Sequence, residues 1–262
     1  VHWGGNYCGH GLLVMASSEL KMRTTNQKPK LRTWVIATLI IIALATLLFV
    51  AYLAFGQHPT NSNSASLVYE SIPAFSGNAS YEVNGGIPFF TESEITDEEY
   101  EFYSSLDSFG RCSSAMACLS KDLMPTEDRG SIGMIKPSGW HTVRYDELID
   151  DKYLYNRCHL IAYMLSGENA NEKNLITGTR YLNVVGMLPY EIEVGNYLES
   201  TSNHVMYRVT PIFVDSELLA RGVLMEAYSV EDSGRGVSFN VFIYNVQPGI
   251  EIDYATGESW IA

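Results

Sequence analysis

The chain has 262 residues, enough for one large domain or two small ones. Hydrophobic residues make up 46% of it and charged residues 18%, which excludes a disordered polymer and a protein with many membrane spans. The net charge of −13, from 17 basic and 30 acidic residues, excludes the basic surface by which many proteins hold nucleic acid. Any chemistry on nucleic acid must therefore depend on a local site.

The first 55 residues predict a membrane segment preceded by a basic leader. Residues 34–55 carry no charge, and at about 1.5 Å per residue they span roughly 33 Å, the thickness of a bilayer core. All five basic residues of this part precede the apolar run, which predicts that residues 1–33 are a cytoplasmic leader and that the remainder lies outside. The run is either a retained anchor, which its length favours, or a signal cleaved near residue 55.

The exported part is predicted to be a linker followed by one α+β domain. Residues 56–80 are rich in Ser and Asn and read as a linker whose last part joins the fold. Without the five basic residues and the single acidic residue of positions 1–55, 12 basic and 29 acidic residues remain, a net charge of −17. Residues 81–262 are long enough for one mixed domain with a sizeable core.

The first elements of this domain are a strand and a helix. Residues 81–90 predict a strand interrupted by Gly85 and Gly86. Thr96, followed by three acidic residues, predicts the start of a helix within residues 92–106.

The later part of the domain predicts an antiparallel meander of three strands. Apolar and other residues alternate over 237–244, and residues 204–214 and 222–230 show similar patterns. Residues 232–236 (DSGRG) supply turn residues between the second and third of these strands.

Cys112 and Cys118 lie close together in the exported part. A disulfide persists outside the cell, so both a structural bridge and two free thiols are open. The five residues between them would close only a short loop, and the gain in stability would be modest. With no second pair of ligands, the two cysteines form a poor zinc site.

Residues 155–199 carry the residue types needed for metal-assisted cleavage of a phosphodiester. A strand over 153–161, a second over 174–179 and a helix over 180–188 predict a strand–strand–helix unit. Such cleavage requires a neutral base, a hard cation on the phosphate and a positive group for the developing charge. His159, with a reference pKa of about 6.5, suits the base, and Arg157 suits the positive group. An Asn side-chain oxygen suits Mg²⁺.

The same segment resembles a known family. The motifs are NRCH (156–159) and NEKNLITGTRYLN (171–183), with KPSGW (136–140) upstream and YRVTP (207–211) and residues 239–258 downstream. Together they resemble the DNA/RNA non-specific endonuclease family, which has a ββα-metal (His-Me finger) core and the motif Asp-Arg-Gly-His. The likeness is to the secreted or surface-anchored DNases of Gram-positive bacteria and covers roughly residues 80–260. It implies a ββα-metal finger packed on a mainly antiparallel sheet.

The resemblance also implies roles for five residues. The motif histidine falls on His159, implied to be the general base, and the metal-binding asparagine falls on Asn183. Asn174 is implied to support the site, Glu199 to orient metal-bound water, and Arg157 to be the motif arginine. The implied cofactor is Mg²⁺, with Mn²⁺ as an alternative, and the implied partner is DNA, with RNA as a further candidate.

Two departures from the family motif leave a second hypothesis open. Asn156 stands where the family has Asp, and Cys158 stands where it has Gly. Neither removes the base or the metal ligand, so the expected function is a metal-dependent, sequence-non-specific endonuclease acting outside the cell. The alternative is a catalytically inactive surface module that binds DNA or a protein.

Helix geometry constrains the metal site. Asn183 and Glu199 are 16 positions apart, which on one straight helix means about 24 Å. Pro189 lies between them and interrupts helical hydrogen bonding. If both residues serve one ion, the chain must fold back between them, and we expect two helices. An unbroken helix would contradict the role of Glu199.

Overall fold

The computed structural model describes residues 35–36, 38–44, 46 and 69–262. The chain divides into two compact units, residues 1–58 and 59–262. The described residues of the first unit are helical. Among the described positions, no helix combines the length and apolar character needed to cross a membrane. The predicted leader 1–33 and most of the predicted segment 34–55 lie outside the described residues, as does the first part of the predicted linker.

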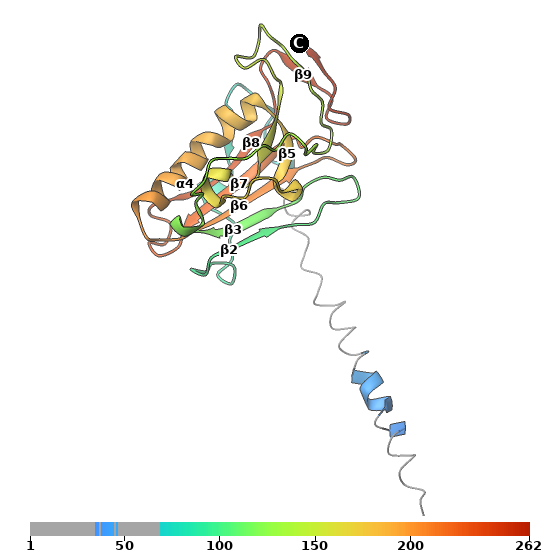
Figure 1. Ribbon diagram of the computed structural model, residues 1–262, viewed down its shortest axis with the longest axis vertical. Helices are drawn as coiled ribbons and strands as arrows, with labels where there is room; N and C mark the ends of the chain where they lie inside the picture. Colours follow the sequence, from blue (N-terminus) through green and yellow to red (C-terminus); the bar gives the residue numbers. More distant parts are fainter. Residues whose placement is uncertain (1–34, 37, 45, 47–68) are drawn as a thin grey trace, which may run out of the picture. The chain divides into compact units, whose positions relative to one another are not determined.

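A six-stranded antiparallel sheet forms the centre of the second unit (Figure 1). Its strands, in spatial order, are β1 (Ser80–Glu82), β8 (Ser238–Tyr244), β7 (Gly222–Ser229), β6 (Val205–Ile212), β3 (Ala115–Leu119) and β2 (Tyr100–Tyr103). The neighbours β6, β7 and β8 are the predicted meander. The mainly antiparallel α+β class is confirmed.

The predicted helix within residues 92–106 does not form. The Thr96 hydroxyl accepts a hydrogen bond from the Glu98 amide at 3.0 Å, which makes a turn instead of a helix start. The chain then enters β2, where Tyr100 pairs with Cys118 of β3. Three of the four residues of β2 are aromatic and suit a pleated surface, so pairing with β3 prevails over the acidic helix-start pattern.

A strand–strand–helix unit lies beside the sheet, as predicted. Strands β4 (Tyr155–His159) and β5 (Leu175–Thr179) pair antiparallel, with His159 opposite Leu175. Between them lie the short helix α3 (Tyr163–Ser166) and the 3-10 turn Glu172–Asn174. The remaining short elements are the 3-10 turns Asn84–Gly86 and Lys121–Leu123 and the hairpin of β9 (Ile250–Ile252) and β10 (Ser259–Ile261).

The helix after β5 is unbroken, which corrects the prediction of two helices. A π-helical segment, Leu182–Met187, runs directly into α4 (Leu188–Ser200). Met187 and Leu188 both have right-handed helical backbone angles, and the Leu188 amide donates to the backbone oxygen of Asn183, five residues earlier. Pro189 is the second residue of α4 and directly follows the π-helical segment, so the helix continues through it. Gly186 lets this segment approach β8, because a Cβ there would lie 2.2 Å from the Ile243 side chain.

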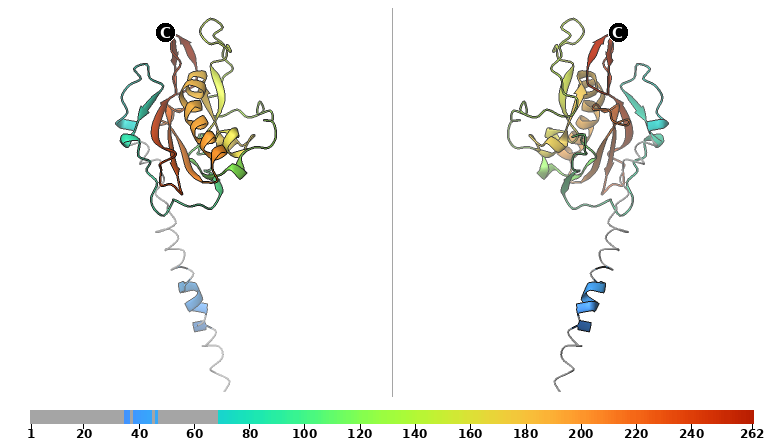
Figure 2. Two further views of the ribbon diagram at one scale, coloured as in Figure 1. Left: turned by 90° about the vertical axis from the view of Figure 1, so that its left-hand side faces the viewer. Right: turned by 90° about the vertical axis from the view of Figure 1, so that its right-hand side faces the viewer.

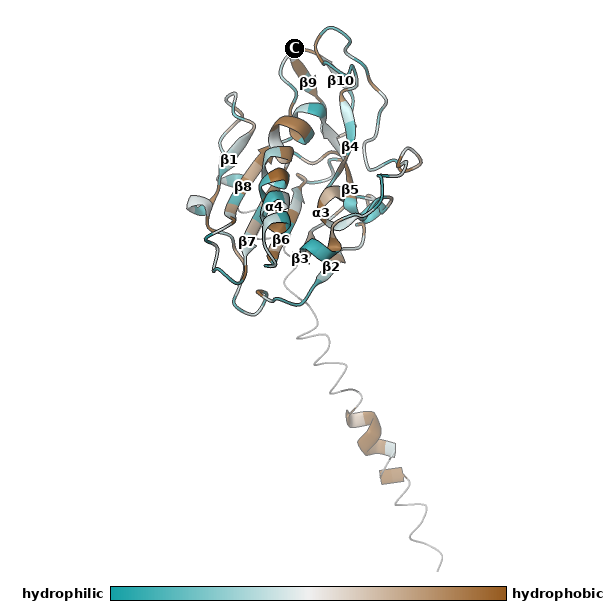
Figure 3. Ribbon diagram, turned by 60° about the vertical axis from the view of Figure 1, so that its left-hand side comes forward, coloured by the Kyte–Doolittle hydropathy of each residue, from teal (hydrophilic) through white to brown (hydrophobic). Residues whose placement is uncertain are grey.

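Helix α4 covers one face of the sheet (Figure 3). Val194 and Leu198 of α4 pack with Tyr207 of β6 and with apolar residues of β3, β7 and β8 in the main core. The segment after residue 69, cyan in Figure 2, lies on the opposite side of the sheet from α4. There the Tyr244 hydroxyl donates to the Pro73 oxygen at 2.8 Å, so the described end of the predicted linker is part of the fold.

Cys112 and Cys118 are free thiols, so the structure decides between the two alternatives. The Cys112 thiol donates to the Leu175 oxygen at 3.1 Å and the Cys118 thiol to the Thr96 oxygen at 3.2 Å. Their side chains therefore contact different segments of the chain. Cys158 is also free and buried.

Candidate active site

His159 ends β4 with its ring almost fully buried and both nitrogens in contact with other groups. Its Nε2 lies 2.8 Å from the backbone oxygen of Asn169, and its Nδ1 lies 3.3 Å from Nη2 of Arg129. The pKa of His159 is lowered to about 4, mainly by burial and also by the Arg129 cation, while the Asn169 contact acts in the opposite direction. The imidazole is therefore neutral at physiological pH.

These contacts define which ring nitrogen can accept a proton. A carbonyl oxygen only accepts hydrogen bonds, so the hydrogen of the neutral ring is on Nε2. Nδ1 then carries the lone pair and faces a guanidinium that is a donor. A neutral imidazole held in this tautomer has the chemistry of a general base.

Asn174 stabilises the backbone just beyond His159. It is fully buried, its Oδ1 accepts from the Ile161 amide at 2.8 Å, and its Nδ2 donates to the Ile161 oxygen at 3.0 Å. The side chain thus substitutes for a neighbouring strand where β4 ends. This is the supporting position that the resemblance implied, and its effect on activity stays a prediction.

Arg157 shares the strand face of His159 but is engaged elsewhere. Its Nε donates to the Ile135 oxygen and its Nη2 to the Gly133 oxygen, and its guanidinium lies 3.9 Å from the ring centre of Trp140. These contacts attach the loop before β4 to the hairpin. The catalytic role predicted for Arg157 stays a prediction, while the guanidinium beside the base belongs to Arg129.

Cys158 occupies the opposite strand face, in the core. A Cβ added at Gly178 of β5 would lie 2.5 Å from both the Cys158 sulfur and the Leu182 side chain. The missing side chain at position 178 therefore makes room for the thiol that replaces the family glycine. Burial raises the pKa of the Cys158 thiol, so it is neutral and unreactive.

Asn183 lies on the first turn of the helix that follows β5. The side chains of Cys158 and Leu182 both contact the space above Gly178. The next residues along the chain, His159 and Asn183, therefore belong to adjoining parts of the strand–strand–helix unit. Asn183 is half-buried, and within residues 69–262 its side-chain amide has no hydrogen-bond partner. Its oxygen is therefore available to a ligand.

Glu191 is a functional candidate that sequence reasoning missed. It is 8% exposed on α4, and burial raises its pKa to about 8, against the lowering effect of Arg129. The available signal was its spacing: eight positions after Asn183 is about two turns of an unbroken helix.

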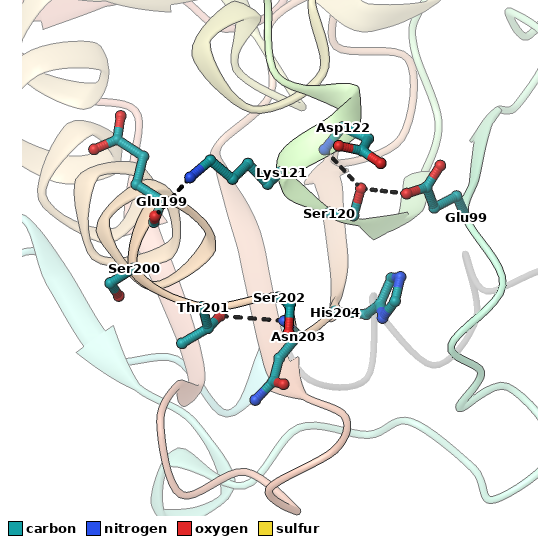
Figure 4. A pocket seen from close by; sticks show the side chains of 10 residues that line it. All are labelled: Glu99, Ser120, Lys121, Asp122, Glu199, Ser200, Thr201, Ser202, Asn203 and His204. Carbon is teal, nitrogen blue, oxygen red and sulfur yellow. Dashed lines mark hydrogen bonds between the residues drawn. The ribbon is translucent and has the colours of Figure 1, made fainter.

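Glu199 lies at the far end of α4, which corrects its assignment. Its side chain is exposed, and its backbone oxygen accepts a hydrogen bond from Lys121 Nζ at 3.0 Å. Figure 4 shows it at the end of α4, where it lines an open polar pocket with residues 120–122 and 200–204. Because the helix does not fold back, Glu199 cannot share an ion with Asn183.

The donor set of this site consists of oxygen atoms. Among the described residues, no group of three or more His, Cys, Asp and Glu side chains could hold a metal ion. The Asn183 amide oxygen has no hydrogen-bond partner in this part of the chain, and an amide oxygen suits a hard cation that retains most of its water. A neutral histidine beside a guanidinium and an unpaired amide oxygen on the following helix are the residue types that metal-assisted general-base hydrolysis requires.

Comparisons with known proteins identify the family to which the chain belongs. Residues 91–231, more than half of the chain, match the family model described as DNA/RNA non-specific endonuclease. A curated deoxyribonuclease of Streptococcus dysgalactiae subsp. equisimilis is 33% identical over 112 residues, which cover 41% of this chain. The matched part is 33% of that relative, so the chain matches about a third of its length.

Two solved nucleases have similar structures. NucA from Streptococcus agalactiae with no metal bound has a TM-score of 0.64 and 27% identity, covering 79% of this chain and 98% of NucA. A second NucA structure, with a magnesium ion bound, has the same TM-score and identity and covers 76% and 94%. The Sda1 nuclease with a bound zinc ion has a TM-score of 0.59 and 25% identity, covering 71% and 97%.

The chain belongs to the DNA/RNA non-specific endonuclease family. The resemblance seen in residues 155–199 is confirmed, and with it the class of enzyme, an endonuclease. The matched region contains His159, Asn183 and Glu191.

Proposed function

We propose that this protein is a metal-dependent, sequence-non-specific endonuclease that hydrolyses phosphodiester bonds of DNA, with RNA as a further substrate to be tested. The observation that carries the proposal is the neutral His159, with Nε2 held by the Asn169 oxygen and Nδ1 facing Arg129. The similarity to a deoxyribonuclease and to two solved nucleases supports the substrate class.

In the proposed mechanism, His159 takes a proton from the attacking water at Nδ1. Its Nε2 keeps its hydrogen and donates it in a hydrogen bond to the Asn169 backbone oxygen, which fixes the ring and stabilises the imidazolium that forms. Arg129 is exposed and lies beside the imidazole, where it would donate to a phosphate oxygen and share the charge that develops.

The residues present fit a magnesium ion. Asn183 would hold it through the amide oxygen, which has no other partner in the described part of the chain, and Glu191 would accept hydrogen bonds from its water ligands. When bound, such an ion supplies positive charge to the scissile phosphate and the leaving oxygen. NucA with magnesium and Sda1 with zinc support a divalent ion, and Mn²⁺ is the alternative to Mg²⁺.

We further propose that the nuclease domain, residues 81–262, acts outside the cell. Residues 34–55 would anchor it in the membrane or direct its secretion, and residues 56–80 would link the two parts. The uncharged apolar run and the basic residues before it support this location. A net charge of −17 on the exported part predicts weak, salt-sensitive capture of nucleic acid.

A cleavage assay on the full chain in mild detergent tests the proposed function. We expect nicking of plasmid DNA with Mg²⁺, loss of nicking with EDTA, and a loss of about 10²–10⁴-fold in His159→Ala, the range for removing a general base. Retained DNA binding without cleavage, identical in His159→Ala, would instead support the inactive binding module. Plasmid left intact by the wild type at all metal concentrations would refute the nuclease proposal.

A further inference from the structure

The turn that follows β8 belongs to the motif of residues 239–258, which the proposed mechanism does not use. Its sequence is Gln247-Pro248-Gly249-Ile250, and the Ile250 amide donates to the Gln247 backbone oxygen at 3.0 Å. Gly249 has a φ of +80°, the conformation that the third position of a type II turn requires, and proline is common at the second position. The turn therefore fixes the backbone from which the Gln247 side chain extends.

Two side chains just after β8 accept hydrogen bonds from backbone amides far away in the sequence. The Thr179 amide donates to Oδ1 of Asn245 at 2.8 Å, and the Tyr181 amide donates to Oε1 of Gln247 at 3.1 Å. Thr179 is the last residue of β5, and Tyr181 lies on the first turn of the helix that follows. Asn245 is fully buried and Gln247 is half-buried. The segment after β8 thus holds the junction between β5 and the helix.

The hydrogen bond from Tyr181 belongs to the start of the helix, where backbone amides have no partner within the helix. The amides on either side of Tyr181 have acceptors of their own. Arg180 donates to the backbone oxygen of the residue before β4 at 2.8 Å, and Leu182 donates to Oγ1 of Thr179 at 2.9 Å. Gln247 supplies the acceptor for the amide between them. Without its oxygen, the first turn would lose one of the contacts that hold it in place.

The same turn carries Asn183, two positions after Tyr181. The π-helical segment begins at Leu182, and the backbone oxygen of Asn183 accepts the hydrogen bond from Leu188 that defines the wide turn. Such π-helical segments are rare and frequently lie at functional sites. Because a metal ligand depends on the groups that orient it, the position of the Asn183 side chain depends on how this turn is fixed.

We infer that Gln247 is a positioning residue: its side-chain oxygen caps the start of the helix that carries Asn183 and holds the Asn183 amide oxygen where it would bind the metal ion. The inference rests on the proposed role of Asn183 as the ligand. It assigns a task to the turn after β8, which lies more than 60 positions after the helix start in the sequence.

The test compares Gln247→Met, Gln247→Glu and Thr201→Val in the full chain in mild detergent. Methionine has a similar length but no acceptor oxygen, whereas glutamate keeps an oxygen at a helix start, which favours negative charge. Thr201 lies at the other end of α4, where its Oγ1 donates to the Tyr197 oxygen at 2.9 Å. Thr201→Val therefore controls for the loss of a hydrogen bond at an end of the same helix.

The first measurement is Mn²⁺ binding without nucleic acid, followed by electron paramagnetic resonance. We expect the Kd to rise about 10-fold in Gln247→Met, the lower end of the range for losing a group that supports a metal ligand. Gln247→Glu should stay within about two-fold of the wild type. Thr201→Val should lower Tm and leave the Kd unchanged. In cleavage assays, Gln247→Met should need more metal, with kcat at saturating metal within about two-fold of the wild type.

Hydrogen exchange of the metal-free protein is a second measurement. The Tyr181 amide should exchange faster in Gln247→Met and at the wild-type rate in Thr201→Val. Unchanged exchange in Gln247→Met, an unchanged Kd, or a Kd in Gln247→Glu as high as in Gln247→Met would overturn the inference. A wild type that binds no Mn²⁺ would overturn it together with the ligand role of Asn183. A wild type that binds Mn²⁺ more tightly than Gln247→Met but leaves DNA intact would refute the proposed function and retain the inference.

Discussion

The Nε2 atom of His159 lies 2.8 Å from the backbone oxygen of Asn169, and this contact leaves Nδ1 as the nitrogen that can accept a proton. Because Asn169 contributes its backbone, the contact does not depend on the identity of its side chain. The loop between β4 and β5 therefore sets the tautomer of the base through its path alone.

Replacing Arg129 should affect kcat, whereas replacing Arg157 should affect stability. We expect Arg129→Ala to lower kcat about 10²-fold with little change in Tm, the order for losing one donor that stabilises a developing charge. Arg157→Ala should instead lower Tm, because it loses the Ile135 and Gly133 hydrogen bonds and the contact with Trp140. Steady-state cleavage and thermal unfolding of both variants measure this, and the reverse pattern would return the charge-sharing role to Arg157.

His159 should titrate far below an ordinary histidine. Its pKa is lowered to about 4 by burial and by Arg129, so its contribution to stability is present above about pH 6.5 and is lost as pH falls through about 4. Imidazole NMR against pH should show a midpoint near 4, and Arg129→Ala should raise it. A midpoint above 6 in the wild type would contradict the buried, neutral base.

Glu191 should destabilise the fold at high pH. Its pKa is raised to about 8 in the folded state, against 4.5 for an ordinary carboxyl. The stability that the protonated form contributes is therefore fully present below about pH 4.5 and is lost as pH rises through 8. Glu191→Gln should therefore have a Tm several degrees above the wild type at pH 9, with the difference vanishing near pH 4.5, while cleavage falls. Thermal unfolding at pH 4.5, 7 and 9 measures this, and equal Tm values at pH 9 would refute it.

Glu199 provides the matched control on the same helix. It is exposed, and only its backbone oxygen is used, so Glu199→Gln should keep cleavage within about two-fold of the wild type and leave Tm nearly unchanged. The same assay applied to Glu191→Gln and Glu199→Gln compares the two carboxylates directly. A large loss in Glu199→Gln alone would restore its original assignment.

Asn183 should determine the Mg²⁺ concentration that cleavage requires. Asn183→Ala removes the available amide oxygen, so cleavage should require a higher Mg²⁺ concentration and fall at saturation. Asn174→Ala should instead lower Tm, because the Ile161 backbone loses both of its partners. Titrating Mg²⁺ into both variants distinguishes a ligand from a supporting residue, and a normal metal requirement in Asn183→Ala would exclude it as the ligand.

Local sequence patterns were enough to predict the strand–strand–helix unit, the β6–β7–β8 meander and the placement of His159 at the end of a strand. These features follow from local patterns: alternation with period two, turn residues at 232–236 and the short motifs around residues 156 and 183. The same local reasoning failed at residues 92–106, where pairing of Tyr100 with Cys118 prevails over an acidic helix start.

The arginine beside His159 and the burial of Glu191 in place of Glu199 follow from long-range packing. Pro189 suggested a break, but packing of Gly186 against Ile243 accompanies an unbroken helix, which carries Glu191 into the core and Glu199 out to solvent. Arg129 lies 30 positions before His159, and a loop brings the two together. Burial and charge proximity depend on elements distant in sequence, so no local pattern could have supplied the pKa values of His159 and Glu191.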